Sequence, residues 1–163
     1  MEPITLPHKR PKPANIGPAL LALLEERLAI DGMQPGEASK SLAAFMQAKH
    51  DSLEGLNELT VLNAEETMVQ SIRYDAVLAR LTERLDDHGR CLGLTFKWRD
   101  AFRPSKNGSS RGQPDLAWER VGVLFTAAAA SSHHARSARS KGAEGLRSAY
   151  RLYQQAAACL ASA

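Results

Sequence analysis

The residues best suited to chemistry lie near the end of the run LAWERVGVLFTAAAASSHHA, residues 116–135. Ser131, Ser132, His133 and His134 could in principle supply a nucleophile and its base. A serine nucleophile of this kind also needs a strained glycine turn and an acid that orients the histidine. The run contains neither a glycine elbow nor an acid placed for that role. We therefore expect no nucleophilic catalysis from this run and predict no catalytic residues elsewhere in the chain.

The histidines also fit a metal site poorly. Neighbouring residues of a helix point about 100° apart, so His133 and His134 cannot ligate one ion from one face. His88 and Cys91 have the loop spacing of half a zinc site, but the sequence holds no second Cys/His pair. The segment NGSSRG, 107–112, lacks the glycine and lysine pattern of a phosphate-binding loop. The sequence therefore predicts no metal ligands and no cofactor-binding residues.

Charge is unevenly distributed, although the net charge is only +3. Residues 25–66 carry nine acids and three bases, whereas residues 90–163 carry twelve bases and four acids. A basic half can attract acidic protein surfaces, anionic lipid or nucleic acid, and charge alone does not choose among them. The side chains that could form such a basic surface are Lys9, Arg10, Lys12, Arg103, Lys106 and Arg111.

The cysteines do not predict a disulfide framework. Cys91 and Cys159 are the only two, and we expect them to be reduced thiols of a cytoplasmic protein. Cys159 is fifth from the last residue, whereas a prenylation signal needs cysteine in the fourth place. The best apolar run, 121–130, is about half the length that spans a bilayer.

The elements that would position these residues are mostly helical, because apolar residues recur at helical spacing over most of the 163-residue chain. One stretch alternates instead, with Leu92, Leu94, Phe96 and Trp98 on one side, which indicates a half-buried strand. We predict a single domain of mostly α class, built from antiparallel helical hairpins with tetratricopeptide-like packing and a small β-strand element. The predicted elements are an N-terminal edge strand within 3–10, a strand near 92–100, a loop over 103–115, and helices over about 16–28, 37–56, 64–87, 115–138 and 142–161.

The apolar pattern also predicts which faces are buried. Trp98 should lie between the strand and the helix that starts near Asp115, and Cys159 should behave as a small apolar residue of its helix. Alanine-rich faces on the last two helices should let their backbones approach closely. The inward positions predicted for the helix over 64–87 are Tyr74, Val77, Leu78, Leu81 and Leu85. Those predicted for the last helix are Leu146, Ala149, Tyr150, Tyr153, Ala157 and Leu160.

Three blocks in sequence order resemble the Bro domain (BRO-one domain) family of Alix-type endosomal sorting adaptors. They are LTFKWRDAF, LAWERVGVLFTAAAASSHHA and EGLRSAYRLYQQAAACLASA. The N-terminal stretch LPHKRPKPANIGPALLALLEERL is also similar to the entry strand, basic turn and first helix of that family. The matching residues are Phe96, Trp98, Asp100, Ala101 and Phe102; Trp118, Glu119, Arg120, Val123, Leu124, Phe125 and Ala128; and Glu144, Gly145, Leu146, Arg147, Tyr153, Gln154 and Ala156.

The resemblance implies a non-catalytic adaptor of endosomal sorting that binds the C-terminal helix of an ESCRT-III subunit. Such a protein would be cytoplasmic and peripheral on endosomes. Arg147, Tyr150 and Arg151 on the last helix are the predicted partner-binding residues, although Ala143 replaces an acidic residue of the family. Two alternatives are a Bro-type adaptor of Rho or ambient-pH signalling and a basic helical module. The basic module would bind anionic membrane or nucleic acid, of which nucleic acid is not favoured.

The family domain is longer than this chain, so residues 1–163 resemble the N-terminal part of a single Bro-type domain. Such a part would expose apolar side chains that the rest of the domain covers. The residues expected to be exposed in that case are Leu146, Tyr150, Tyr153 and Leu160.

Overall fold

The computed structural model describes residues 36–49, 59–84, 95–99 and 110–163, together with Pro18, Leu21, Ala22 and Glu25. Those four residues are helical, within the predicted first helix. The remaining elements, in chain order, are α2 (Glu37–Lys49), α3 (Ala64–Arg84), β1 (Phe96–Arg99), β2 (Ser110–Gln113), α4 (Leu116–Ala138) and α5 (Gly142–Ser162). The predicted mostly helical class with a small β element is confirmed.

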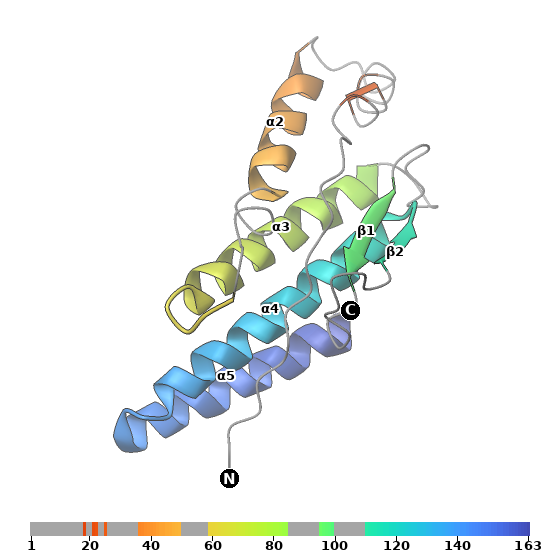
Figure 1. The fold of residues 1–163 in the computed structure, drawn as a ribbon. Helices are drawn as coiled ribbons and strands as arrows, with labels where there is room; N and C mark the ends of the chain where they lie inside the picture. Colours follow the sequence, from red (N-terminus) through yellow and green to blue (C-terminus); the bar gives the residue numbers. More distant parts are fainter. Residues whose placement is uncertain are drawn as a thin grey trace.

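Three long helices form the body of the described fold. The chain runs along α3, returns along α4 and turns back along α5, so that neighbouring helices are antiparallel (Figure 1). The middle helix, α4, packs against both α3 and α5, and α2 packs against α3. Because α4 contributes to both helix pairs, its two faces decide how the other two helices are placed.

The start of α4 is fixed by a side-chain cap. Asp115 has extended backbone geometry, and its Oδ1 atom accepts a hydrogen bond from the backbone N–H of Ala117 at 2.8 Å. This bond satisfies one of the N–H groups that have no partner within the first turn of a helix. The cap confirms the predicted helix start near residue 115. At its other end α4 stops at Ala138, and a turn over residues 139–141 leads into α5.

The predicted loop over residues 103–115 is wrong in its last part, because Ser110–Gln113 form β2. This strand pairs antiparallel with β1, and Trp98 lies opposite Arg111 in the register. The sequence Ser-Arg-Gly-Gln has no apolar alternation, since all of Arg111–Gln113 is exposed. Backbone pairing with β1 holds β2 in place, and backbone pairing leaves no hydrophobic signal in the sequence. The predicted N-terminal edge strand lies outside the described residues.

The main core lies where α2, α3, α4 and the hairpin meet. Phe96 and Trp98 point inward with 2% exposure each, while Lys97 and Arg99 are exposed, which confirms the two-residue period of the strand. Leu92 and Leu94 lie outside the described residues. The buried cluster consists of Phe45, Tyr74, Leu78, Leu81, Phe96, Trp98, Leu116 and Val123.

Lys49 is a basic residue within this core. Its side chain is only 2% exposed, and its Nζ atom lies 5.9 Å from the centre of the Phe96 ring. Phe96 also belongs to the cluster that holds Phe45 and Tyr74, whose rings meet edge to face at 5.5 Å. A cation above an aromatic face is attracted by the ring quadrupole. Lys49 is therefore a charged residue on the apolar face of α2, and its side chain nevertheless packs in the core.

Across the described part of the chain, no helix combines the length and the apolar character needed to cross a membrane.

Candidate functional site

Glu119 is a buried carboxylate in the first turn of α4. It is 1% exposed, and it accepts hydrogen bonds from the Tyr74 hydroxyl at 3.1 Å and from Trp98 Nε1 at 2.7 Å. These donors come from α3 and β1, so one carboxylate joins three elements. A buried carboxylate is tolerated when its oxygens accept such bonds. Glu119 is thus enclosed and serves as a structural junction.

The sequence contains a signal for this junction that our prediction did not use. Glu119 occupies the same helical stripe as Leu116 and Val123, both of which are fully buried. A carboxylate within an apolar stripe must find buried donors, and Tyr74 and Trp98 were themselves predicted to face inward. The burial of Trp98 against the start of α4 is confirmed.

A second polar contact joins α3 to α4 nearer the surface. Arg120 donates from Nε to Asp75 Oδ1 at 2.8 Å and from an Nη atom to Oδ2 at 3.3 Å. The hydrogen bond to Asp75 raises the pKa of the Arg120 guanidinium, against the opposing effect of burial. The paired donor geometry orients the two helices, since both bonds form only when guanidinium and carboxylate lie in one plane.

The serines at the end of the opening run are part of the helix packing. Ser131 Oγ donates to the carbonyl of Ala127 at 2.9 Å, and Ser132 Oγ donates to the carbonyl of Ala129 at 2.7 Å. Both serines are at most 2% exposed. Their hydroxyls are bonded to backbone within a packed interior, where no substrate can approach them.

Small residues give α4 two helix-packing faces. Residues 126–132, with the sequence TAAAASS, are all buried between neighbouring helices. On α5 the matching contact is Gly145, where a side chain would overlap the carbonyl oxygen of Ala138. Ala135, Ala138 and Ala149 form a cluster at this contact. Close approach of the two backbones, as predicted, therefore depends on the absence of bulky side chains.

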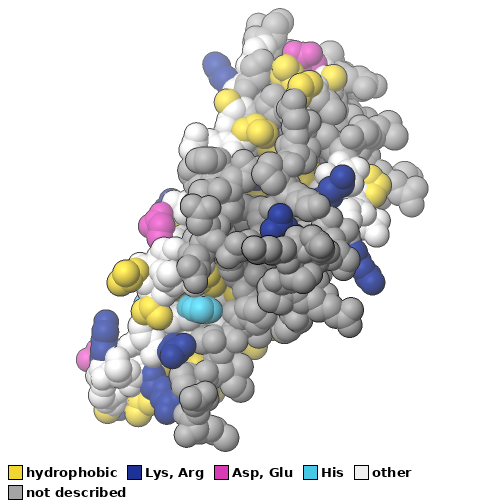
Figure 2. Space-filling model, viewed as in Figure 1, with side chains coloured by type: hydrophobic (Ala, Val, Ile, Leu, Met, Phe, Trp, Pro, Cys, Tyr) yellow, Lys and Arg dark blue, Asp and Glu magenta, His cyan; other side chains and the backbone are white. Residues whose placement is uncertain are grey.

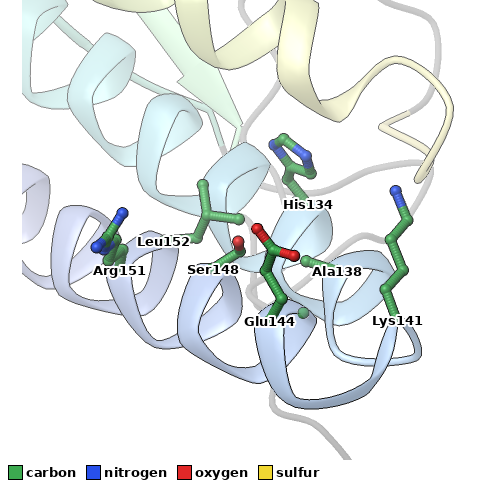
Figure 3. A pocket seen from close by; sticks show the side chains of 8 residues that line it. His134, Ala138, Lys141, Glu144, Ser148, Arg151 and Leu152 are labelled. Carbon is green, nitrogen blue, oxygen red and sulfur yellow. The ribbon is translucent and has the colours of Figure 1, made fainter.

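The two histidines lie half-buried near the end of α4, where His134 Nε2 is 3.9 Å from Glu65 Oε2 on α3. Within the described residues, no three His, Cys, Asp or Glu side chains are grouped as a metal site. His134 does line a shallow groove of about 480 Å³ at the turn between α4 and α5. Figure 3 shows Glu144 projecting into it, with Lys141 and Arg151 to either side. These opposite charges specify no single class of ligand.

The last helix buries one face and exposes another. Ala149 is buried against α4, as predicted, and Tyr153 is half-buried. Leu146, Tyr150 and Leu160 are 55%, 65% and 42% exposed, and Ala157 is exposed as well. The prediction that these four residues point inward is therefore wrong for this chain. The burial against α4 follows a neighbouring stripe, Gly145, Ala149, Leu152 and Ala156. Three of these four residues are small, which allows α4 to approach closely.

The alternative expectation, in which the chain exposes an apolar surface, fits Leu146, Tyr150 and Leu160.

Cys159 lies at the edge of the buried face and is half-buried. Burial raises the pKa of its thiol, and the charge of Asp75 raises it further. Cys159 therefore stays in the neutral thiol form that suits a packed helix.

The predicted partner-binding residues come together on α5, whereas the predicted basic surface is mostly outside the described part of the chain. Arg147, Tyr150 and Arg151 are all exposed on neighbouring turns. Arg111 is exposed on β2. Lys and Arg side chains also gather at the end of the molecule that carries the α4–α5 turn (Figure 2, lower left). The residues of the predicted basic surface outside the described ranges are Lys9, Arg10, Lys12, Arg103 and Lys106.

Solved structures share this arrangement. The ALIX BRO1 domain in complex with CHMP4C superposes with a TM-score of 0.78 at 18% identity, over 96% of this chain and 43% of that one. ALIX in complex with the SIVmac239 PYKEVTEDL late domain superposes with a TM-score of 0.78 at 18% identity, over 98% of this chain and 23% of that one. A Bro1 domain described for endosomal targeting superposes with a TM-score of 0.70 at 20% identity, over 98% of this chain and 42% of that one. These likenesses show the fold, and this chain spans less than half of each relative.

A sequence search of the curated proteins finds no match. The family model for the BRO1-like domain, in contrast, matches residues 3–163. That range includes the aromatic hairpin strand, the Glu119 junction and the α4–α5 pair. The chain belongs to the BRO1-like domain family.

Proposed function

We propose that this chain is a non-catalytic interaction scaffold of the endosomal sorting pathway, and that α5 binds an amphipathic helix of an ESCRT-III subunit. Residues 1–163 form, in this proposal, the N-terminal part of a single Bro-type domain that acts peripherally on endosomes. Family membership and the CHMP4C complex of the ALIX BRO1 domain support the proposal. The residues that bear the contact are Arg147, Tyr150 and Arg151.

One observation carries the proposal. Tyr150 is 65% exposed and flanks Arg147 and Arg151 on the same side of α5, and neither guanidinium has an ion-pair partner among the described residues. A large aromatic side chain beside two unpaired cations suits a helix that has an apolar anchor flanked by acids. The aromatic ring would supply most of the affinity. The exposed cations would mainly set the association rate and its salt dependence.

The test is fluorescence anisotropy with a labelled peptide of the CHMP4C C-terminal helix. We expect saturable binding that weakens as salt rises. Arg147→Glu with Arg151→Glu should reduce affinity at least tenfold and flatten the salt dependence, because the attraction becomes repulsion. The matched control is Arg136→Glu with Arg139→Glu, which makes the same charge change at the end of α4.

Two results would contradict the proposal. One is equal loss of binding in both double variants, which would reduce the effect to net charge. The other is no peptide binding together with binding to vesicles of anionic lipid that depends on Arg111. The second result would favour the basic surface as the functional site, with the β1–β2 hairpin as its centre.

A further inference from the structure

Three arginine–serine pairs stand close together around the α4–α5 turn. They are Arg136–Ser137, Arg139–Ser140 and Arg147–Ser148. Basic residues beside a serine are recognised by protein kinases whose substrate grooves are acidic, because the charges are complementary. By sequence the three serines are similar candidates for such an enzyme, and the structure separates them.

Ser137 and Ser148 lie within long helices. Ser137 is half-buried in the last turn of α4, and its hydroxyl donates to the carbonyl of His134 at 2.8 Å. Ser148 is exposed, but it lies in the second turn of α5 beside the buried Ala149. A kinase must hold the hydroxyl against its catalytic aspartate and the γ-phosphate of ATP, so the segment around the serine has to leave the helix. For Ser148 this would break the packing of α5 against α4.

Ser140, in contrast, is an exposed residue of the turn itself. Its hydroxyl donates to the carbonyl of Ser137 at 2.8 Å, a surface bond that water can replace at little cost. Two backbone hydrogen bonds hold the turn, donated by the N–H groups of Arg139 and Lys141. Opening the end of a helix costs less free energy than opening its packed interior. Of the three serines, Ser140 therefore reaches a kinase with the least loss of packing.

The turn is exposed for a different reason from the apolar side chains of α5. Segments of a longer domain that cover Leu146 and Tyr150 would pack along the length of α5. The turn lies beyond these residues, at the end of the α4–α5 pair (Figure 1). Covering the side of α5 therefore does not require covering Ser140.

The charges around Ser140 favour a phosphate group. Arg136, Arg139 and Lys141 are exposed within four residues of it, and the nearest acid in the sequence is Glu144. The C-terminal end of α4 repels an anion and the N-terminal end of α5 attracts one, so the two helix dipoles oppose each other at the turn. The neighbouring cations therefore decide, because arginine and lysine donate charge-assisted hydrogen bonds to phosphate oxygens.

We propose that Ser140 is a phosphorylation site for a serine/threonine kinase that recognises basic segments. The γ-phosphoryl group of ATP passes to Ser140 Oγ, so a bond forms between this oxygen and phosphorus. The bond from phosphorus to the β–γ bridging oxygen breaks, and ADP leaves. The hydroxyl proton passes to the catalytic aspartate of the kinase.

This inference goes beyond the proposed function and does not depend on it. A phosphoserine carries a charge of about −1.5 to −2 at pH 7, so it would offset much of the positive charge of the turn. It also has a consequence for the proposed function, because Arg147 and Arg151 lie on the helix that follows. Phosphorylation would slow the association of α5 with an acidic helix.

The test is phosphorylation of the full 163-residue chain by the catalytic domain of protein kinase C with ATP, with the modified residues located by tandem mass spectrometry. We expect incorporation at Ser140 to exceed that at Ser137 or Ser148 about tenfold, because only the turn opens readily. Ser140→Ala should remove most of the incorporation. Ser148→Ala is the matched control, since Ser148 is also exposed and also follows an arginine, and it should leave incorporation unchanged.

A peptide of residues 133–152 shows whether the structure makes the choice. Each helical part of this peptide is too short to be stable alone, so the three serines should be phosphorylated at comparable rates. Incorporation into the folded chain mainly at Ser137 or Ser148, or no incorporation into the folded chain, would overturn the proposal.

The part played by the basic segment is tested with charge variants of the full chain. Arg139→Glu with Lys141→Glu should slow phosphorylation about tenfold, because the kinase then meets acids on both sides of Ser140. The control is Arg73→Glu with Arg80→Glu, which makes the same charge change on exposed positions of α3 and should have little effect. Equal slowing by both double variants would mean that net charge, and not the turn, is recognised, and would overturn the proposal.

Discussion

At the scale of single residues, the Glu119 carboxylate turns three separate elements into one core. Its two donors, Tyr74 and Trp98, belong to α3 and β1, whereas Glu119 itself lies on α4. Removing one donor leaves part of a buried charge without a partner, and that costs more than the hydrogen bond contributes. The residues around this junction should therefore be among the least tolerant of substitution in the described structure.

Trp98→Ala should lower the free energy of unfolding by about 3–5 kcal/mol, as large aromatic truncations in cores do. Trp98→Phe keeps a six-membered aromatic ring and removes the five-membered part of the indole with its N–H group, so we expect a smaller loss of about 1–3 kcal/mol. Urea titration followed by circular dichroism measures both. A loss below about 1 kcal/mol for Trp98→Ala would show that the indole is not packed as described.

Gly122→Ala should destabilise the protein, although replacing glycine by alanine within a helix ordinarily stabilises by about 0.5–1 kcal/mol. The reason is contact, because a Cβ atom on residue 122 would overlap the indole ring of Trp98. The same substitution in a Trp98→Ala background should lose its cost or become stabilising. Additive effects in this double-mutant cycle would contradict the contact.

Cys159 should react slowly with a thiol reagent in the folded chain, measured in a Cys91→Ser background. Its raised pKa keeps the thiolate scarce at neutral pH, so the rate should keep rising to a higher pH than for the unfolded chain. The neutral thiol stabilises the fold below the ordinary thiol pKa, and that contribution disappears as pH rises through the folded-state pKa. Identical pH profiles in buffer and in urea would contradict this prediction.

At the scale of elements, the packing of α4 against α3 and α5 depends on its small side chains. Residues 126–132 present only methyl and hydroxyl groups to neighbouring helices, so the interhelix spacing is set by backbone. This packing makes α4 sensitive to added volume. A helix with larger side chains at these positions would hold α3 and α5 farther apart and would open the contact at Gly145.

Ala129→Leu should therefore cost about 1–3 kcal/mol or more, because Ala129 is fully buried and the added carbons have no free volume. The control is Ala158→Leu, which makes the same change on an exposed position of α5 and should be nearly neutral. Thermal unfolding of the two variants gives the comparison. An equal loss for both would mean that the buried alanine face tolerates larger side chains.

Periodicity predicted α3, α4, α5 and β1 because in each of them one face meets the core. It failed for β2, which is held by backbone bonds to β1 and buries no apolar side chain. It also assigned the wrong face of α5, because two apolar stripes stand side by side there. Hydrophobic pattern cannot tell which of two stripes the neighbouring helix covers. The small residues Gly145 and Ala149 were the better guide, since they match the alanines of α4.

At the scale of the whole molecule, the candidate site was predicted only through resemblance. Arg147, Tyr150 and Arg151 have no motif of their own, and their spacing is equally that of an ordinary solvated helix face. The structure adds that Tyr150 is exposed beside two arginines that have no ion-pair partner among the described residues. The Glu119 junction shows the opposite case. Trp98 and Glu119 lie within the blocks that resemble the family, Tyr74 is predicted to face inward by helical periodicity, and only the contacts among the three were missing.

The central place of α4 also implies an order of folding events. Its contact with α5 closes across a short turn, whereas its bond to Tyr74 of α3 joins residues 45 apart in the sequence. Loop closure favours local contacts first, so the α4–α5 hairpin should form early and α3 should dock late. In refolding kinetics, substitutions such as Ala149→Gly should slow folding, whereas Tyr74→Phe should mainly speed unfolding. A growing chain would then complete its stable core only after α5 has been synthesised.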